Sequence, residues 1–377
     1  MTGIPVSGQC DPVFADIEAA FRHNMDHGDP ICGDELGACV SVVIDGEVVV
    51  DLWGGYRDAA RTQIWERDTT ACMMSVTKAC SAVALLTLVD QGAVDMTEKV
   101  STYWPEFSGD GKEDMTVRTL ISHQSGVIYA DAAPAGSLWD GHSVEAALES
   151  AAPEWKPGTG GAYHSFTYGP LLNGLIRHAD GRDVGTLWRE NVAQPFSIDF
   201  GIGLTASQAA RRAEFVETPG TPSRDGIKGE AESPLLRAWN PMPKTEDFNS
   251  EDWVYNQHAS ANGHGNARAI ARLYGGLANG GVIDGNRLLS EDLIADATSE
   301  HWDDLDRMTN RPFRFGCGFM LSCPPFPFGG HRGNFGHTGI GGAIGFGDPE
   351  RKIGFSYCGN RMAPIADTGP FAGPLIE

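Results

Sequence analysis

The sequence predicts an α+β fold in which an antiparallel sheet, flanked by helices, is built from both ends of the chain. Near the start, GACVSVVIDGEVVVDLWGG holds two β-branched runs on either side of Asp45-Gly46, a strong signal for a two-residue hairpin. Near the end, RFGCGFMLSC and GGAIGFGDPERKIGFSYCGN have hairpin character again, the latter with a turn at Asp348-Pro349. Between these ends strand signals become rare. This order of elements predicts one sheet with a mostly helical insertion.

Two structural units follow from this order. We expect residues 1–95 and 290–377 to form the sheet unit and residues 96–289 to form the mostly helical unit. The helical stretches include TKACSAVALLTLVDQG, where Gly92 is a C-terminal stop, GPLLNGLIRHADG and NARAIARLYGGLANGG. The cleft between the two units is the expected place of an active site.

Composition restricts the class of partner. The 377 residues are 41% hydrophobic and 21% charged, which is enough apolar sequence for a large core. A formal net charge of -22 argues against nucleic acid or an anionic membrane surface as partner and leaves a small-molecule substrate. The sequence has no export signal, no apolar run of membrane-spanning length and no CxxC pair among its eight cysteines. We therefore expect free, mostly buried thiols and a cytoplasmic location.

Several familiar sites are missing from the sequence. There is no GxSxG, no phosphate-binding P-loop and no GxGxxG after a predicted strand. HRGNFGH and HASANGH place histidines six residues apart in Gly-rich loops, which matches no standard zinc spacing. The sequence thus predicts neither a metal site nor a cofactor.

The candidate chemistry begins in MMSVTKACSA, where Ser75 and Lys78 form the chain's single Ser-x-x-Lys. On a helix, residues three apart share a face, so the lysine amine reaches the serine hydroxyl. A serine at a helix N-terminus also lies where backbone N–H groups favour developing negative charge. This pair suits acyl transfer, although an N-cap serine followed by a solvated lysine is the ordinary alternative.

A lysine needs help to act as a base, because its usual pKa of ~10.4 keeps it charged at neutral pH. A tyrosine facing the amine can share the proton with it. The stretch WKPGTGGAYHSFTYGPLLNGLI offers Tyr163, after a Gly-rich loop, and Tyr168, at the start of a helix. Tyr163 has the more plausible cleft position, and Tyr168 is expected to pack.

Four stretches, SVTK, TVRTLISHQSG, PGTGGAYHSFTYG and GHTGIGGAIGFGDPE, together resemble the serine β-lactamase and penicillin-binding-protein-like superfamily. Within it they are most similar to the class C-like family VIII carboxylesterases. The match is ordered and runs from about residue 15 to the end. The resemblance implies that Ser75 is acylated, that Lys78 is its partner and that Tyr163 matches the tyrosine of the second motif. In the same resemblance His123 belongs to a structural turn at a helix end.

The resemblance also assigns a third motif and an oxyanion hole. His337, Thr338 and Gly339 match the Lys-Thr-Gly of most β-lactamases and are expected to bind substrate. The oxyanion hole would consist of the backbone N–H groups of Ser75 and Ile340, which need no particular side chain.

Three departures from the family pattern matter. Ser165 replaces the asparagine of Tyr-x-Asn, so this substrate-binding position lacks an amide, and His337 replaces a permanently charged lysine. The tail APIADTGPFAGPLIE stops where relatives usually carry a longer terminal helix, so we expect a shortened C-terminus.

The predicted function is hydrolysis of carboxylic esters with short acyl chains through an acyl-enzyme. A β-lactamase, a D-amino-acid amidase or peptidase, and an acyltransferase would all use the same site and remain alternatives. A non-catalytic binding protein of this fold is the more distant alternative, and the intact Ser-Lys-Tyr set argues against it.

Overall fold

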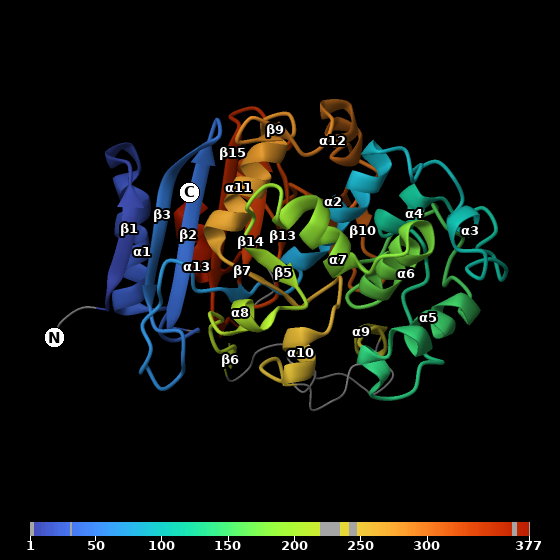
Figure 1. The fold of residues 1–377 in the computed structure, drawn as a ribbon, viewed down its shortest axis with the longest axis horizontal. Helices are drawn as coiled ribbons and strands as arrows, with labels where there is room; N and C mark the ends of the chain where they lie inside the picture. The colour runs from blue at the N-terminus through green and yellow to red at the C-terminus, as the bar shows by residue number, and fades with distance from the viewer. Residues whose placement is uncertain (1–3, 31, 219–233, 241–246, 364–367, 377) are drawn as a thin grey trace.

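The computed structural model describes residues 4–30, 32–218, 234–240, 247–363 and 368–376. Within them, nine strands form one antiparallel sheet whose outer members are β1 and β10 (Figure 1). Across the sheet the strands follow the order β1 (Val6–Cys10), β3 (Glu47–Gly55), β2 (Gly37–Ile44), β15 (Ile353–Gly359), β14 (Ile344–Asp348), β13 (Phe335–Thr338), β12 (Met320–Leu321), β11 (Pro312–Phe315) and β10 (Trp302–Leu305). The sheet therefore joins the two ends of the chain, and the predicted α+β class is confirmed.

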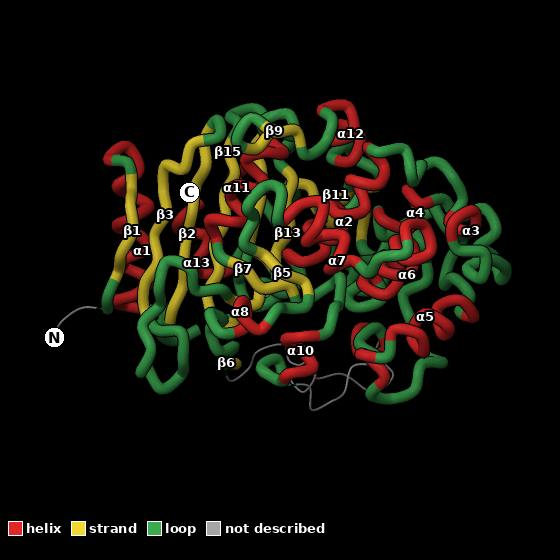
Figure 2. The backbone as a smooth tube through the Cα atoms, in the orientation of Figure 1, coloured by secondary structure: helices red, strands yellow, loops and turns green. Residues whose placement is uncertain are grey.

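Helices cover both faces of this sheet and continue as a separate group beside it (Figure 2). The helices are α1 (Ala15–His27), α2 (Val76–Asp90), α3 (Val100–Tyr103), α4 (Val117–Ile121), α5 (Gly141–Ser150), α6 (Tyr168–Asp180), α7 (Val184–Trp188), α8 (Ala206–Ala209), α9 (Pro234–Arg237), α10 (Glu251–Tyr255), α11 (Ala267–Ala278), α12 (Glu291–Ala297) and α13 (Gly369–Ile376). Shorter helical turns are η1 (Pro12–Phe14), η2 (Ser137–Trp139), η3 (Arg189–Ala193) and η4 (Phe328–Gly330).

Short strands also occur outside the main sheet. They are β4 (Ala71–Cys72), β7 (Gly263–Gly265) and β5 (Phe200–Ile202) in one small sheet, β8 (Val282–Ile283) with β9 (Asn286–Arg287), and β6 (Val216–Glu217) with β16 (Arg361–Met362). Most of these lie in the segment 96–289, whose other regular elements among the described residues are helices. Helix α11, from the same segment, packs on the main sheet against β15, β14 and β2. The division into units at residues 96 and 289 stays a prediction.

The local turn signals act as expected. Asp45 and Gly46 both have positive φ, 51° and 90°, and join β2 to β3 with Ile44 opposite Glu47. This is the conformation that an Asp-Gly turn favours, because its twist matches that of the strands. Gly92, with φ of 73°, follows the last residues of α2 and ends that helix.

Helix α2 is the central helix of the fold. From Val76 to Leu88 every one of its residues is buried, including Lys78. A helix that is apolar on all sides belongs inside a protein, and here α2 lies between the sheet and helices α6 and α7. The first turn of α2 is therefore held from several directions at once.

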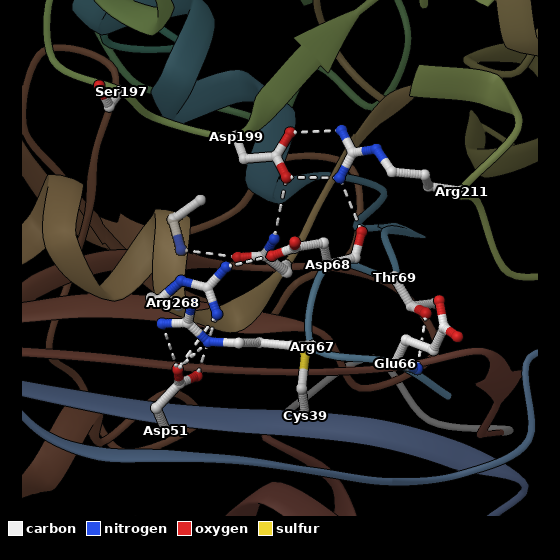
Figure 3. A network of polar contacts seen from close by, with 12 residues as sticks. Cys39, Asp51, Glu66, Arg67, Asp68, Thr69, Ser197, Asp199, Arg211 and Arg268 are labelled. Atoms are coloured by element: carbon white, nitrogen blue, oxygen red, sulfur yellow. Dashed lines mark hydrogen bonds and ion pairs between the residues drawn. The ribbon is translucent and has the colours of Figure 1, made fainter. Parts of the chain in front are cut away.

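Ion pairs connect the sheet to the segments beside it (Figure 3). On β3, Asp51 is nearly buried and accepts from Arg268 of α11 at 3.1 Å and from Arg67 at 3.4 Å. Arg268 also contacts Asp68 at 2.8 Å, and a second pair joins Arg211 to Asp199. We call these residues the sheet-side charge network.

The cysteines and the helix lengths add two further findings. All eight cysteines lie in the described part of the chain, and all are free thiols, seven of them buried. Their predicted state is confirmed. Across the described residues, no helix is both long and apolar enough to cross a membrane.

Candidate active site

The backbone around Ser75 presents its hydroxyl group rather than using it as a cap. Met74 has a positive φ of 45°, a backbone conformation that residues other than glycine rarely adopt. Ser75 follows it at the N-terminus of α2. The Met73 N–H donates to the carbonyl of Gly263 at 2.9 Å, which ties this turn to β7. Ser75 makes no side-chain capping bond. The ordinary interpretation of an N-cap serine is therefore wrong.

The Ser75 hydroxyl instead accepts from Lys78. The Lys78 Nζ lies 3.0 Å from Ser75 Oγ and 3.1 Å from the carbonyl oxygen of Ser260. The lysine is fully buried, and no carboxylate among the described residues forms an ion pair with it. Burial lowers the pKa of Lys78 well below its usual value. A neutral amine next to a serine hydroxyl is suited to accept a proton from it.

Tyr163, not Tyr168, is the tyrosine at this pair. The Lys78 Nζ lies 4.8 Å from the centre of the Tyr163 ring, and Ser75 is close enough to the Tyr163 hydroxyl to affect its pKa. Burial raises the pKa of Tyr163, and the neighbouring Ser75 only partly opposes this, so the phenol keeps its proton at neutral pH. Tyr168 is fully buried, and its hydroxyl donates to the carbonyl of Ile121, as expected for a packing residue.

The predicted oxyanion donors lie at the same place. Among the described residues, the backbone N–H groups of Ser75 and Ile340 have no hydrogen-bond acceptor, and both residues line the cavity described below. Gly339 makes this arrangement possible, because a Cβ atom there would lie 2.3 Å from the carbonyl oxygen of Met73. The end of β13 can thus approach the turn before α2 closely.

His337 is placed differently from the expectation of a substrate contact. The side chain is buried behind Tyr163, with ring centres 5.9 Å apart, and does not line the cavity. Its Nδ1 lies 2.6 Å from the carbonyl oxygen of Thr338, and Nε2 has no partner among the described residues. Burial, with a contribution from Lys78, lowers the pKa of His337 to about 3, so the imidazole is neutral. Thr338 lines the cavity, whereas Gly339 does not.

The cavity beside Ser75 has a volume of about 410 Å³ and mostly apolar walls. Ser165 lies in its wall, as the second motif predicts. Most of the remaining lining residues have aromatic or methionine side chains: Met74, Phe166, Trp239, Phe248, Trp253, Met308, Phe313, Met320, Phe326 and Met362. Arg311 is the one charged side chain among the described lining residues.

His123 belongs to the support of the site. It has a positive φ of 63° directly after α4, which confirms the predicted turn. Its ring lies 5.3 Å from that of Tyr163, and its Nδ1 accepts the backbone N–H of His164 at 3.1 Å. Burial lowers the pKa of His123 well below its usual value. The imidazole therefore packs against Tyr163 as a neutral group.

Two contributing residues escaped the sequence analysis. Ser260 acts through its backbone carbonyl, which leaves no side-chain signal in HASANGH beyond the small residues themselves. Asp306 is buried, and one of its oxygens accepts the Tyr163 N–H while the other accepts the N–H groups of Met308 and Thr309. The sequence Asp-x-x-Thr at 306–309 is typical of such a side-chain-stabilised turn.

A potential metal-binding cluster occurs elsewhere. Glu106, Glu149 and His178 are the described residues whose ligand atoms gather within 4.8 Å of one another. They are at least partly exposed, and none of them lines the cavity. Nothing in their position connects them with Ser75.

Comparisons with known proteins agree on one family. A family model described as β-lactamase matches residues 17–370. The chain is 33% identical to the esterase/β-lactamase LipL of Mycobacterium tuberculosis, over 97% of this chain and 86% of that protein.

Solved structures show the same fold. A penicillin-binding-protein homologue from Caulobacter crescentus superposes with a TM-score of 0.90 at 34% identity, over 99% of this chain and 98% of that one. A family VIII carboxylesterase does so with a TM-score of 0.88, also at 34% identity and with the same coverage. The chain therefore belongs to the β-lactamase family and is a serine hydrolase with the fold of that family.

Proposed function

We propose that the protein hydrolyses carboxylic esters of small molecules through an acyl-enzyme on Ser75. The observation that carries this proposal is the 3.0 Å contact between Ser75 Oγ and the amine of Lys78, which is buried and forms no ion pair with a described residue. The names of similar proteins support the substrate class, since one is an esterase/β-lactamase and another a family VIII carboxylesterase.

In acylation, Ser75 Oγ attacks the ester carbonyl carbon while its proton passes to the neutral amine of Lys78. The resulting oxyanion is held by the N–H groups of Ser75 and Ile340. When the intermediate collapses, the bond to the alcohol oxygen breaks and that oxygen takes the proton of the Tyr163 hydroxyl. Lys78 then returns a proton to Tyr163. The lowered pKa of Lys78 and the raised pKa of Tyr163 fit these two roles.

Deacylation reverses the order of the partners. A water molecule attacks the acyl carbon and gives its proton to Lys78. The bond to Ser75 Oγ then breaks, and the serine recovers its proton from the same amine. No step uses a cofactor.

A label on Ser75 tests the proposal directly. A fluorophosphonate probe should add one group per chain at Ser75, and Ser75→Ala should abolish both the label and the turnover of an aryl acetate. In other enzymes, removal of a nucleophile costs on the order of 10⁶ in kcat. Labelling of another serine, with activity kept in Ser75→Ala, would overturn the assignment. A wild type that neither reacts with the probe nor turns over any ester would favour a binding protein of this fold.

The preference for short acyl chains is part of the proposal, and a series of aryl esters from acetate to octanoate tests it. The same assays should include D-aminoacyl amides and an alcohol acceptor, because amidases and acyltransferases use this chemistry too. A D-aminopeptidase of Brucella ovis is 26% identical over 42% of this chain.

β-Lactam hydrolysis is the second candidate, favoured by the name of the relative LipL. A β-lactam carries a carboxylate, and the lysine that His337 replaces helps to hold it in the superfamily. The buried, neutral His337 supplies no such charge. Loss of one charge-assisted hydrogen bond costs about 1.5–3 kcal/mol, or roughly ten- to hundredfold. We expect kcat/KM for an aryl acetate to exceed that for a cephalosporin by at least this factor. Equal values would disprove the preference.

A further inference from the structure

Arg311 has an unusual position for a cation in this acidic chain. The chain has 50 acidic and 28 basic residues, yet the described lining of the cavity holds no carboxylate and only this one charge. The side chain is exposed, and its contact is with the face of Phe326, 5.5 Å from the ring centre. Within the described parts of the chain, Arg311 forms no ion pair and no side-chain hydrogen bond. Its donors are therefore free to bind a ligand.

The acidic residues nearest to Arg311 in sequence are engaged elsewhere. Asp303 pairs with Arg332 at 2.9 Å, and Asp304 accepts the backbone N–H of Leu305. The Asp306 carboxylate is turned inward to the backbone of Tyr163 and of its own turn. A guanidinium on this loop could have been neutralised by any of them, and none of the three does so.

A row of neighbouring aromatic rings connects Arg311 to the reacting groups. The Tyr163 ring lies parallel to the Phe313 ring, with ring centres 5.9 Å apart, and the Phe313 and Phe326 ring centres are 5.1 Å apart. The Arg311 guanidinium lies over the Phe326 ring. Phe313 and Phe326 belong to the hydrophobic cluster that packs under the main sheet. We call this side of the cavity the tyrosine side.

Another part of the lining belongs to a second cluster and is formed by apolar and aromatic side chains. It consists of Phe166, Trp239, Phe248, Trp253 and Met362, together with Met74 beside Ser75. The cavity beside Ser75 is thus lined both by this uncharged aromatic cluster and by the tyrosine side, to which Arg311 belongs.

We propose that Arg311 is a specificity-determining residue that binds an anionic group, such as a carboxylate, on the alcohol part of the ester. The inference rests on the proposed function. Tyr163 is there the donor to the leaving alcohol, so the alcohol oxygen must lie next to its hydroxyl group. From that point an aromatic alcohol extends along Phe313 and Phe326 and brings a distal carboxylate to Arg311. The acyl group is left with the apolar wall around Trp239.

Two esters of equal shape test the proposal: 4-acetoxybenzoate, whose alcohol part is anionic, and 4-acetoxybenzamide, whose alcohol part is neutral. The quantity measured is the ratio of kcat/KM for the benzoate to that for the benzamide. In Arg311→Gln this ratio should fall about three- to tenfold, because Arg311 is exposed and solvent weakens its ion pair. Arg311→Lys should restore part of the ratio, since lysine keeps the charge but not the planar fork of donors.

The matched control is Arg22→Gln. Arg22 lies on α1, pairs with Glu18 and does not line the cavity, and its replacement changes the net charge by the same amount. This variant should keep the wild-type ratio. A ratio unchanged in Arg311→Gln would overturn the proposal, and so would an equal fall in Arg22→Gln, which would indicate a general field effect. If the wild type hydrolyses neither ester, the proposed function itself fails.

Discussion

The surroundings of Lys78 and those of Arg268 show two ways in which this chain accommodates a basic side chain away from most of the solvent. Arg268 meets two carboxylates, Asp51 and Asp68, in the sheet-side charge network (Figure 3). Burial acts to lower the pKa of Arg268, but the two acids outweigh it and raise the pKa above its usual value. Among the described residues, the Lys78 amine is hydrogen-bonded to a hydroxyl and a carbonyl oxygen and forms no ion pair, and burial lowers its pKa.

The difference shows that the placement of acids, not burial alone, decides whether a cation keeps its proton. With 50 acidic residues in the chain, the absence of an ion pair to Lys78 among the described residues is a specific feature of the fold. The same contrast separates a structural charge from a proposed base: Arg268 stays ionised and holds segments together, whereas the lowered pKa of Lys78 favours the neutral amine that can accept a proton. Substitutions around Lys78 should therefore change activity, and substitutions around Arg268 should change stability.

The largest expected effect comes from removing the proton-transfer groups. Lys78→Ala and Tyr163→Phe should each lower kcat on an aryl acetate by several orders of magnitude, because each interrupts the same transfer. The double variant should be little slower than the worse single variant, as found for groups that act as one unit. Losses that add in free energy would show instead that the two residues act independently. Fluorophosphonate labelling of Ser75 should slow in parallel.

How far the sequence could predict this site depends on whether a signal was local. The Asp45-Gly46 hairpin, the stop at Gly92 and the serine-lysine spacing are each encoded within a few residues, and each was predicted. Tyr163 could be chosen over Tyr168 because a Gly-rich loop precedes it.

Long-range contacts could not be predicted in this way. Asp306 supports Tyr163 from 143 residues away, and Ser260 contributes only a backbone carbonyl. The placement of His337, which was expected to bind substrate, could not be predicted for a related reason, since its position behind Tyr163 depends on how β13 meets α2. Arg311 gave no signal at all, because a free arginine and a paired one look alike in sequence.

The second prediction concerns a substitution that gives Lys78 a neighbouring carboxylate, as Arg268 has in Asp51 and Asp68. His337→Glu places a carboxylate near the amine, and an opposite charge at that range raises the pKa of a lysine by about 1–3 units. Since the neutral amine is the proposed base, kcat/KM of the wild type should rise with pH through the lowered pKa of Lys78. In His337→Glu this rise should move to higher pH, so activity at pH 7 falls.

His337→Gln is the control for this second change, because it alters the same buried position without adding charge. Its pH profile should have the wild-type midpoint. Equal midpoints in the Gln and Glu variants would refute the electrostatic explanation. No falling limb is expected near neutral pH in any of them, because burial raises the pKa of Tyr163 above its usual value and keeps the phenol protonated.

The smallest effect on catalysis is expected from a substitution of Arg268. Arg268→Met removes the closer partner of Asp51, whose carboxylate is nearly buried and keeps only the contact of 3.4 Å with the largely exposed Arg67. A buried charge that loses a hydrogen-bonded partner costs about 1–3 kcal/mol. Urea unfolding should therefore show a free energy of unfolding lower by this amount.

The turnover of Arg268→Met should nevertheless stay within about twofold of wild type, because the sheet-side charge network contacts neither Ser75 nor the lining of the cavity. Arg22→Met, which breaks an exposed pair on α1, provides the stability baseline and should change the unfolding free energy by no more than about 0.5 kcal/mol. A loss of kcat in Arg268→Met as large as that in Lys78→Ala would mean that the network acts on the site. The division between structural and reactive cations would then be wrong. If Lys78 and Arg268 act separately, Arg268→Met must lower the free energy of unfolding without lowering kcat.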